Sequence, residues 1–228
     1  MGTTPKKLRF AVLATDVAAF RLHEGVLEIL LIPITNVPEF KGMRGLPGGL
    51  IDPKETAEQA AVRVLTEKGG LTGGYLEQLY TFSDVDRDPR GRVVSVAYLA
   101  LFAPNEARLE SEGREGADSG ARWCPMSNLP SLAYDHDNIA QVALERLRAR
   151  IGYTTIVRHL LPKEFTLTEL QKAYESILGY SLDKRNFRKK IQVPGIVSAT
   201  GRMRTQGASR PAQLYRFAHK GVRTIEIL

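Results

Sequence analysis

The sequence changes character near residue 152. The first 152 residues contain 18 Lys and Arg against 20 Asp and Glu, a net charge of −2, whereas residues 153–228 contain 14 against 5, a net charge of +9. A charge asymmetry of this size indicates two modules, of which the basic one contacts a polyanion such as nucleic acid. Charge alone is equally compatible with a basic surface that serves only solubility. The length of 228 residues is sufficient for two domains, which we place at residues 1–150 and 151–228.

The distribution of apolar residues and the cysteine content argue against several classes of protein. The longest uncharged apolar stretch, Val93–Ala103, has 11 residues, fewer than the roughly 18 to 20 that a membrane-spanning helix needs. Met1–Lys7 runs into a strand-like segment without the features of an export signal. The single cysteine, Cys124, excludes an intrachain disulfide and a cysteine-rich zinc site. We therefore expect a cytoplasmic protein that does not associate with a membrane.

The first domain is predicted to be mixed α/β. Apolar runs predict strands at residues 8–19, 26–33, 75–82 and 92–102, and a closing helix is predicted at residues 137–150. A further helix is predicted over residues 53–68, because Asp52 can cap it and Glu55 can complete a capping box. Pro53 suits its first position, and two glycines end it.

The residues around this helix resemble the Nudix box. Gly49 is followed after five residues by Glu55 and after seven more by Arg63, and the pattern continues with Leu65, Glu67, Gly70 and Leu71. The resemblance implies an α/β/α sandwich that binds a nucleoside diphosphate linked to another group. Active members hydrolyse the pyrophosphate with divalent cations.

Departures from the Nudix pattern bear on whether the domain hydrolyses the nucleotide that it binds. An active box places three carboxylates at i, i+3 and i+4 on one helical face, where this sequence has Val64, Glu67 and Lys68. Mg²⁺ requires oxygen ligands, so one carboxylate beside an ammonium makes at best a weak site. We therefore predict that the domain has no catalytic residues and no bound metal, that it hydrolyses nucleotide slowly or not at all, and that Lys68 meets the phosphate charge.

The effector site is predicted to include residues beyond the helix. The charged loop Asp84–Arg92 contains three arginines, and guanidinium groups match phosphate oxygens in a bidentate way. A solvated loop is the alternative, as is an internal ion pair between Arg63 and a glutamate. The predicted effector-binding residues are Arg44, Gly48, Gly49, Glu55, Arg63, Glu67, Lys68, Arg87, Arg90 and His136.

The second domain has the helix pattern of a helix-turn-helix. A short amphipathic helix is predicted over residues 153–161, and Thr166 with Glu169 forms a capping box for a second helix that ends at Gly179. The third helix is predicted over residues 182–192, with Phe187 and Ile191 facing inward and its basic residues outward.

Two strands, at residues 195–200 and 212–217, complete a winged helix, joined by an arginine-bearing loop over residues 201–211. In such domains the third helix enters the major groove and the wing contacts the backbone or minor groove. A basic helix that is merely solvated is the alternative. The predicted DNA-binding residues are Lys184, Arg185, Asn186, Arg188, Lys189, Arg202, Arg204 and Arg210.

Taken together, the two domains resemble the Nudix-related transcriptional regulators, the NrtR family. Beyond the box, the resemblance covers the segments Arg87–Tyr98, Asp135–Asp137, Asn186–Arg188 and Arg210–Phe217. It implies a homodimeric repressor of genes for NAD biosynthesis or salvage, released from double-stranded operator DNA by ADP-ribose or a related nucleotide. Two alternatives remain: an active ADP-ribose pyrophosphatase with an appended nucleic-acid-binding domain, and an adaptor whose winged helix binds protein.

Overall fold

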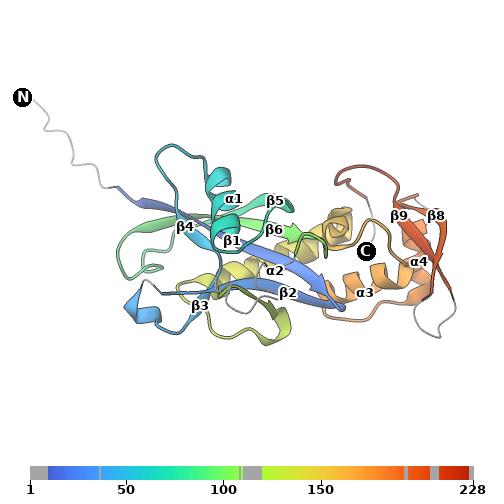
Figure 1. Cartoon of the computed structure of the whole chain (residues 1–228), viewed down its shortest axis with the longest axis horizontal. Helices are drawn as coiled ribbons and strands as arrows, with labels where there is room; N and C mark the ends of the chain where they lie inside the picture. The colour runs from blue at the N-terminus through green and yellow to red at the C-terminus, as the bar shows by residue number, and fades with distance from the viewer. Residues whose placement is uncertain are drawn as a thin grey trace, which may run out of the picture.

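Seven strands form one sheet in the first domain of the computed structural model (Figure 1). The order is β3-β2-β1-β6-β5, with β4 paired to β1 and β7 to β2. The central pair, β1 and β6, is parallel and comprises the two longest strands of the sheet, with 12 and 10 residues. The strands are β1 (Val12–His23), β2 (Val26–Pro33), β3 (Arg44–Gly45), β4 (Gly48–Leu50), β5 (Tyr75–Phe82), β6 (Val93–Phe102) and β7 (Arg122–Pro125). The structure describes residues 10–35, 37–107, 109, 120–192, 195–205 and 211–225.

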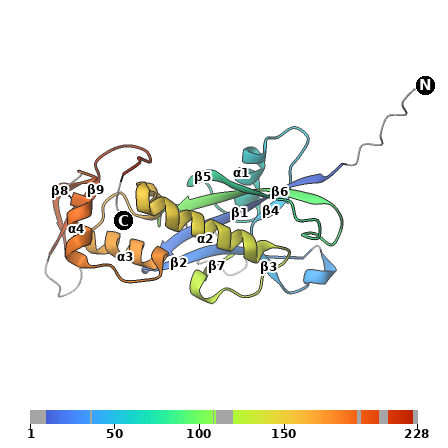
Figure 2. The ribbon, with the colours of Figure 1, turned by 180° about the vertical axis from the view of Figure 1, so that it is seen from behind.

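One helix covers each face of this sheet (Figure 2). Helix α1 (Ala57–Glu67) buries Val64 in one apolar cluster with Val17 of β1. Helix α2 (His136–Tyr153) buries Leu147 in a second cluster with Phe20 of β1, on the opposite side of the strand. The predicted α/β/α sandwich is confirmed. None of the helices in the described ranges has the length and apolar character needed to cross a membrane.

The start of α1 differs from the prediction. The helix begins at Ala57 rather than at residue 53, because Thr56 caps it: the Thr56 hydroxyl accepts the Gln59 N–H (3.2 Å) and the Gln59 side chain accepts the Thr56 N–H (2.8 Å). Asp52 and Glu55 instead close a separate turn, in which the Asp52 N–H donates to Glu55 Oε1. Two overlapping capping signals occur in the sequence, and the second one starts the helix.

The second domain is a winged helix, as predicted. It comprises the 3-10 helix η3 (Ile156–Leu160), α3 (Leu167–Leu178), α4 (Lys184–Gln192), β8 (Val197–Arg204) and β9 (Ala212–Phe217). The Thr166 and Glu169 capping box starts α3, and Gly179 ends it with φ of +83°.

The first helix of this domain is shorter than predicted. Tyr153 belongs to α2, and only Ile156–Leu160 form a 3-10 turn. The intervening backbone pairs with the C-terminal segment instead, since the Thr155 N–H donates to the Arg223 carbonyl (2.9 Å) and the Ile225 N–H to the Tyr153 carbonyl (2.7 Å). These hydrogen bonds remove residues 153–155 from the predicted helix.

The wing also differs from its prediction. Strand β8 continues to Arg204 because its register with β9 shifts between Ala199 and Met203, where Gly201 adopts φ of +76°. Arg202 and Arg204 therefore lie in the strand and not in the loop. Arg210 falls outside the described residues.

The two domains share one apolar core. A single cluster of buried residues includes Phe20 and Leu99 of the sheet, Leu147 of α2, and Leu160 and Phe165 of the winged helix. Arg148 of α2 donates to the Ile177 carbonyl of α3 (2.8 Å), and Tyr75 of β5 stacks on His159 at 4.6 Å between ring centroids. Burial, together with Arg158, lowers the pKa of His159 to about 4, so this imidazole is neutral at pH 7.

Candidate functional site

A buried carboxylate, Asp16 of β1, lies at the centre of a polar network. Its Oδ2 accepts hydrogen bonds from Ser95 Oγ (2.6 Å) and Arg87 Nη2 (3.0 Å), and its Oδ1 lies 3.3 Å from His136 Nε2. Burial favours the neutral acid, but His136, Ser95 and Arg87 outweigh it and hold the pKa of Asp16 below its ordinary value of 3.8. A permanent negative charge therefore lies inside the domain.

The orientation of the His136 ring follows from its contacts. Its Nδ1 accepts the backbone N–H of Leu46 (2.9 Å), so the ring proton is on Nε2, facing Asp16. Two glycines make this approach possible: a Cβ at Gly45 would lie 2.6 Å from His136 Nδ1, and one at Gly48 would lie 2.1 Å from Asp16 Oδ1. The segment Leu46-Pro47-Gly48, which immediately precedes the Nudix-like pattern, is thus packed directly against His136 and Asp16.

Arg87 connects this network to the start of α2. Its Nε and Nη2 donate to the two carboxylate oxygens of Asp135 at 2.9 and 2.7 Å, and its side chain is 3% exposed. Asp135 occupies the N-cap position of α2 but makes no side-chain capping bond, because its carboxylate is engaged by Arg87. We refer to Asp16, Arg87, Ser95, Asp135 and His136 as the Asp16 network.

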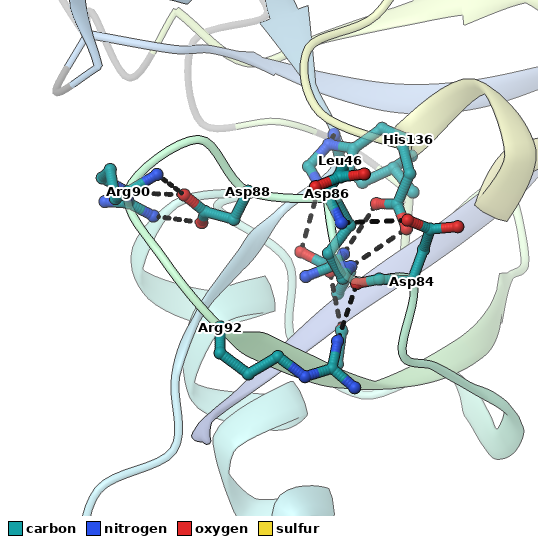
Figure 3. A network of polar contacts seen from close by, with 11 residues as sticks. Leu46, Asp84, Asp86, Asp88, Arg90, Arg92 and His136 are labelled. Atoms are coloured by element: carbon teal, nitrogen blue, oxygen red, sulfur yellow. Dashed lines mark hydrogen bonds and ion pairs between the residues drawn. The ribbon is translucent and has the colours of Figure 1, made fainter. Parts of the chain in front are cut away.

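The other two arginines of the charged loop face elsewhere. Figure 3 shows Arg90 paired with Asp88, apart from His136, and Arg92 turned toward the chain near Asp84. Arg90 donates to Asp88 at 2.9 and 2.7 Å, and Arg92 donates to the carbonyls of Ser83 and Asp84. Only Arg87 of the three contributes to the cavity described next.

A cavity of about 970 Å³ lies beside the Asp16 network. Arg87 is the one cation among its described lining residues. Aromatic walls suit a base or sugar ring, and carboxylates can accept hydrogen bonds from sugar hydroxyls. The rings are Phe40, Tyr80, Phe82 and Tyr134, and the carboxylates are Glu39, Asp84, Asp86 and Asp135.

The Nudix-like residues of α1 form a separate cluster. Arg63 donates to both carboxylate oxygens of Glu55 (2.6 and 3.0 Å) and lies 3.5 Å from Glu67. The hydrogen bonds from Arg63 lower the pKa of Glu55 to about 2. Lys68 Nζ donates to the Gly48 carbonyl, and desolvation of the ammonium lowers its pKa from the ordinary value. Val64, at the position of a missing carboxylate, is fully buried.

The predicted effector residues thus fall into distinct places. Arg87 and His136 are in the Asp16 network, whereas Glu55, Arg63 and Glu67 form the α1 cluster. Gly48 and Lys68 lie between the two groups, beside Asp16, and Gly49 adjoins Val64 and Lys68. Arg44 donates to the carbonyls of Leu31 and Gly120, and Arg90 pairs with Asp88.

Sequence reasoning missed Asp16, Ser95 and the role of Asp135. A signal for Asp16 was present, since it is the only charged residue between Phe10 and Phe20 in an otherwise apolar strand. Asp135 stands at the N-cap position of α2, where an aspartate is ordinarily expected to cap the helix. Its partner Arg87 is 48 residues away, and local patterns carry no information about such a pair.

The winged helix presents a basic surface on α4. The helix contains five Lys and Arg and no acidic residue, and Phe187 and Ile191 anchor it in the core. Asp183 caps it by accepting the Asn186 N–H at 2.7 Å. Arg188 is partly buried. The exposed residues are Lys184, Arg185, Asn186 and Lys189, together with Lys190, which was not among the predicted contacts.

Comparisons with known proteins match both halves of the chain. Residues 13–147 match the model of the NUDIX domain, and residues 157–217 match that of the NrtR DNA-binding winged helix domain. ADPR responsive transcriptional repressor NtrR of Acinetobacter baylyi is 38% identical over 211 residues, covering 91% of this chain and 82% of that protein. The chain belongs to the NrtR family.

Crystal structures of NrtR from Shewanella oneidensis resemble this NrtR-family chain. The complex with a 27mer DNA is 34% identical, with a TM-score of 0.76 over 90% of this chain and 93% of that one. The NUDIX domain in complex with ADP ribose is 35% identical, with a TM-score of 0.53 over 64% of this chain and 94% of that one.

The Nudix half also resembles an enzyme. ADP-ribose pyrophosphatase of Methanocaldococcus jannaschii is 36% identical over 135 residues, which are 54% of this chain and 76% of that protein.

Proposed function

We propose that this protein is a transcriptional repressor that binds operator DNA through α4 and the wing and responds to ADP-ribose bound in its Nudix domain. The observation that carries the proposal is the capped α4, with five cations, fused through a shared core to a domain with a nucleotide-sized cavity. The names of the Acinetobacter and Shewanella relatives support it. Genes of NAD biosynthesis or salvage are the proposed targets, on the sequence resemblance.

The cavity beside the Asp16 network is the proposed nucleotide site. Its aromatic walls suit the adenine ring, and its carboxylates suit the ribose hydroxyls. Arg87 is the one cation among the described lining residues, and its Nε and Nη2 already donate to Asp135 and Asp16. The ammonium of Lys68 lies near Asp16 but outside the described lining. We expect affinity to come mainly from rings and hydroxyls, because four carboxylates surround one guanidinium.

The residues of the box do not fit a catalytic Mg²⁺. Glu55 and Glu67 both face Arg63, and the ammonium of Lys68 lies where an active box has a carboxylate. No group of three or more His, Cys, Asp or Glu within the described ranges is placed to hold a metal. We propose that ADP-ribose acts as an effector without a metal and is hydrolysed slowly or not at all. The enzyme alternative draws on the similarity to the Methanocaldococcus pyrophosphatase.

A homodimer is the proposed assembly. Phe10, Val12, Leu13 and Leu50 are exposed, and β1 pairs with β4 at Ala14 and Leu50, so these apolar side chains belong to one end of the sheet. Exposed apolar patches of this kind mark protein interfaces. A second copy of the chain, related by twofold symmetry, would place two winged helices on a pseudo-palindromic operator.

The test is a fluorescence anisotropy titration with DNA from upstream of the protein's own gene. The titration is repeated with ADP-ribose and with NAD, each in Mg²⁺ and in a chelator. We expect tight, salt-dependent binding that ADP-ribose releases in the chelator. Absence of DNA binding, with ADP-ribose consumed in Mg²⁺, would instead establish the pyrophosphatase. Absence of both would favour the protein-binding adaptor.

Tyr80→Ala should weaken ADP-ribose binding about tenfold to hundredfold, because stacking of a base on an aromatic ring contributes about 1–3 kcal/mol. Tyr80 lines the cavity and is 61% exposed, so its removal leaves the core intact. Isothermal titration calorimetry measures the effect. Tyr180→Ala is the matched control, since Tyr180 is 59% exposed and does not line the cavity. Equal ADP-ribose affinities for the two variants would show that the adenine ring does not stack on Tyr80.

A further inference from the structure

The two arginines of β8, Arg202 and Arg204, are held at the N-terminal end of α3. Arg204 Nη1 donates to Glu169 Oε1 at 2.7 Å, and its Nη2 donates to the Glu164 carbonyl at 3.0 Å. Arg202 pairs with the Glu164 carboxylate. The guanidinium of Arg204 thus spans from the end of β8 to two acceptors on another element.

Glu169 serves two partners with its two carboxylate oxygens. Its Oε2 accepts the Thr166 N–H at 2.7 Å and so completes the capping box, while its Oε1 faces Arg204. The cap fixes the position of the carboxylate, because the side chain is held to the first turn of the helix. Arg204 therefore binds an acceptor that the helix end has already positioned.

The conformation of β8 is adapted to this contact. Thr200 Oγ1 donates to the Leu214 carbonyl (3.1 Å) and accepts the Arg202 N–H (3.2 Å) within the irregular stretch around Gly201. Bulges of this kind redirect the side chains that follow. At the other end of the hairpin, Phe165 and Tyr215 exchange two backbone hydrogen bonds of 3.0 and 2.8 Å. The wing is thus tied at two separate points to the first turn of α3 and the residues just before it.

We propose that Arg204 is a positioning residue for DNA binding, a strut that sets the wing against α3, and that Glu169 is its partner. Both of its terminal nitrogens have protein acceptors, and moving to a phosphate would break a charge-assisted hydrogen bond. Arg202 differs, because its side chain is 71% exposed, against 39% for Arg204. The assignment revises the prediction that Arg204 contacts DNA, and it rests on the proposed DNA-binding function.

Two substitutions separate a strut from a phosphate contact. Glu169→Gln keeps one oxygen for the Thr166 N–H but presents an amide NH₂, which cannot accept from Arg204. Arg204→Ala removes the other partner. We expect each variant to lower operator affinity about threefold to tenfold, as the loss of a partly exposed charge-assisted pair implies, with an unchanged slope of log K against log salt. The double variant should lose little more than either one.

Hydrogen exchange of the free protein gives a readout that does not depend on DNA. Both variants should speed amide exchange in β8 and β9 while the melting temperature of the domain stays close to that of the wild type. Arg202→Ala is the contrasting variant in the DNA titrations. We expect its slope of log K against log salt to decrease in magnitude by about 0.9, because one phosphate contact is lost.

The proposal is overturned if Arg204→Ala flattens the salt slope as Arg202→Ala does, or if Glu169→Gln leaves affinity and exchange unchanged. The first result would show that Arg204 contacts DNA directly. The second would show that the ion pair between Arg204 and Glu169 has no effect on DNA binding. Failure of the wild-type protein to bind operator DNA would instead refute the proposed function. The exchange measurement would then still decide whether the strut exists.

Discussion

Arg87→Ala should lower the free energy of unfolding by about 3–5 kcal/mol, the usual cost of removing one partner from a buried ion pair. The carboxylate of Asp16 would stay inside the domain without its guanidinium partner, and Ser95 Oγ and His136 Nε2 would remain as its side-chain contacts. Asp135 would also lose both of its hydrogen bonds from Arg87. Urea denaturation followed by circular dichroism measures the loss.

Arg90→Ala is the matched control for this substitution, because Arg90 lies three residues away on the same loop. Its side chain is 50% exposed, against 3% for Arg87, and it pairs with Asp88 alone among carboxylates. We expect its removal to cost no more than about 1 kcal/mol. Similar losses for the two variants would show that the Asp16 network contributes nothing beyond a surface pair.

The pH dependence of stability provides a signature of the same network. The pKa of Asp16 in the folded protein is below its ordinary value of 3.8, so the carboxylate contributes stability above about pH 4. That stability is lost as the pH falls below 4 toward the folded pKa. In Arg87→Ala the contribution is reduced, and wild-type stability should therefore fall more steeply than that of the variant as the pH is lowered below about 4. Parallel curves would show that Arg87 contributes little to the low pKa of Asp16.

Replacing Arg185 and Lys189 together with alanine should lower operator affinity about hundredfold. The two residues are four apart on α4, on the side of the helix opposite Phe187 and Ile191, so they face outward together. A lost base contact costs about 1–3 kcal/mol, and each lost phosphate contact reduces the salt slope by about 0.9. Anisotropy titrations over a salt series measure both quantities.

The control removes the same charge from the other domain. Lys41 and Lys54 are both exposed, and their replacement by alanine leaves α4 untouched. This double variant should lose far less affinity than the α4 variant. Comparable losses would mean that net charge alone drives the interaction and that α4 is merely a solvated basic surface.

Sequence patterns predicted the elements whose signals are local. The Thr166 and Glu169 box starts α3 because no second cap competes with it. At α1, in contrast, Asp52 and Thr56 both head capping boxes, and Glu55 is drawn to Arg63, eight residues away. The short η3 was overestimated as a helix because backbone pairing with residues 223–225 has no local signal.

The site was predicted less completely than the fold. The Nudix spacing and the basic helix identified α1 and α4, but Asp16 meets Arg87 and Ser95 across 71 and 79 residues of chain. Such pairs arise from the parallel register of β1 with β6 and from the loop before β6. Arg44 and Arg204 are chemically suited to ligand binding, yet protein acceptors engage both.

Helix α2 begins in the Asp16 network and ends against the winged helix, with no flexible linker between. The two domains are therefore connected by a continuous helix and a shared core rather than by a flexible linker. In the proposed dimer each DNA-reading helix would be carried on a stiff arm, whose angle is set where Asp135 meets Arg87. An effector could not act by loosening a tether. It would have to act by changing the angle between the two winged helices of the dimer. The quantity that the nucleotide controls would then be the distance between the two copies of α4, which has to match the spacing of the operator half-sites.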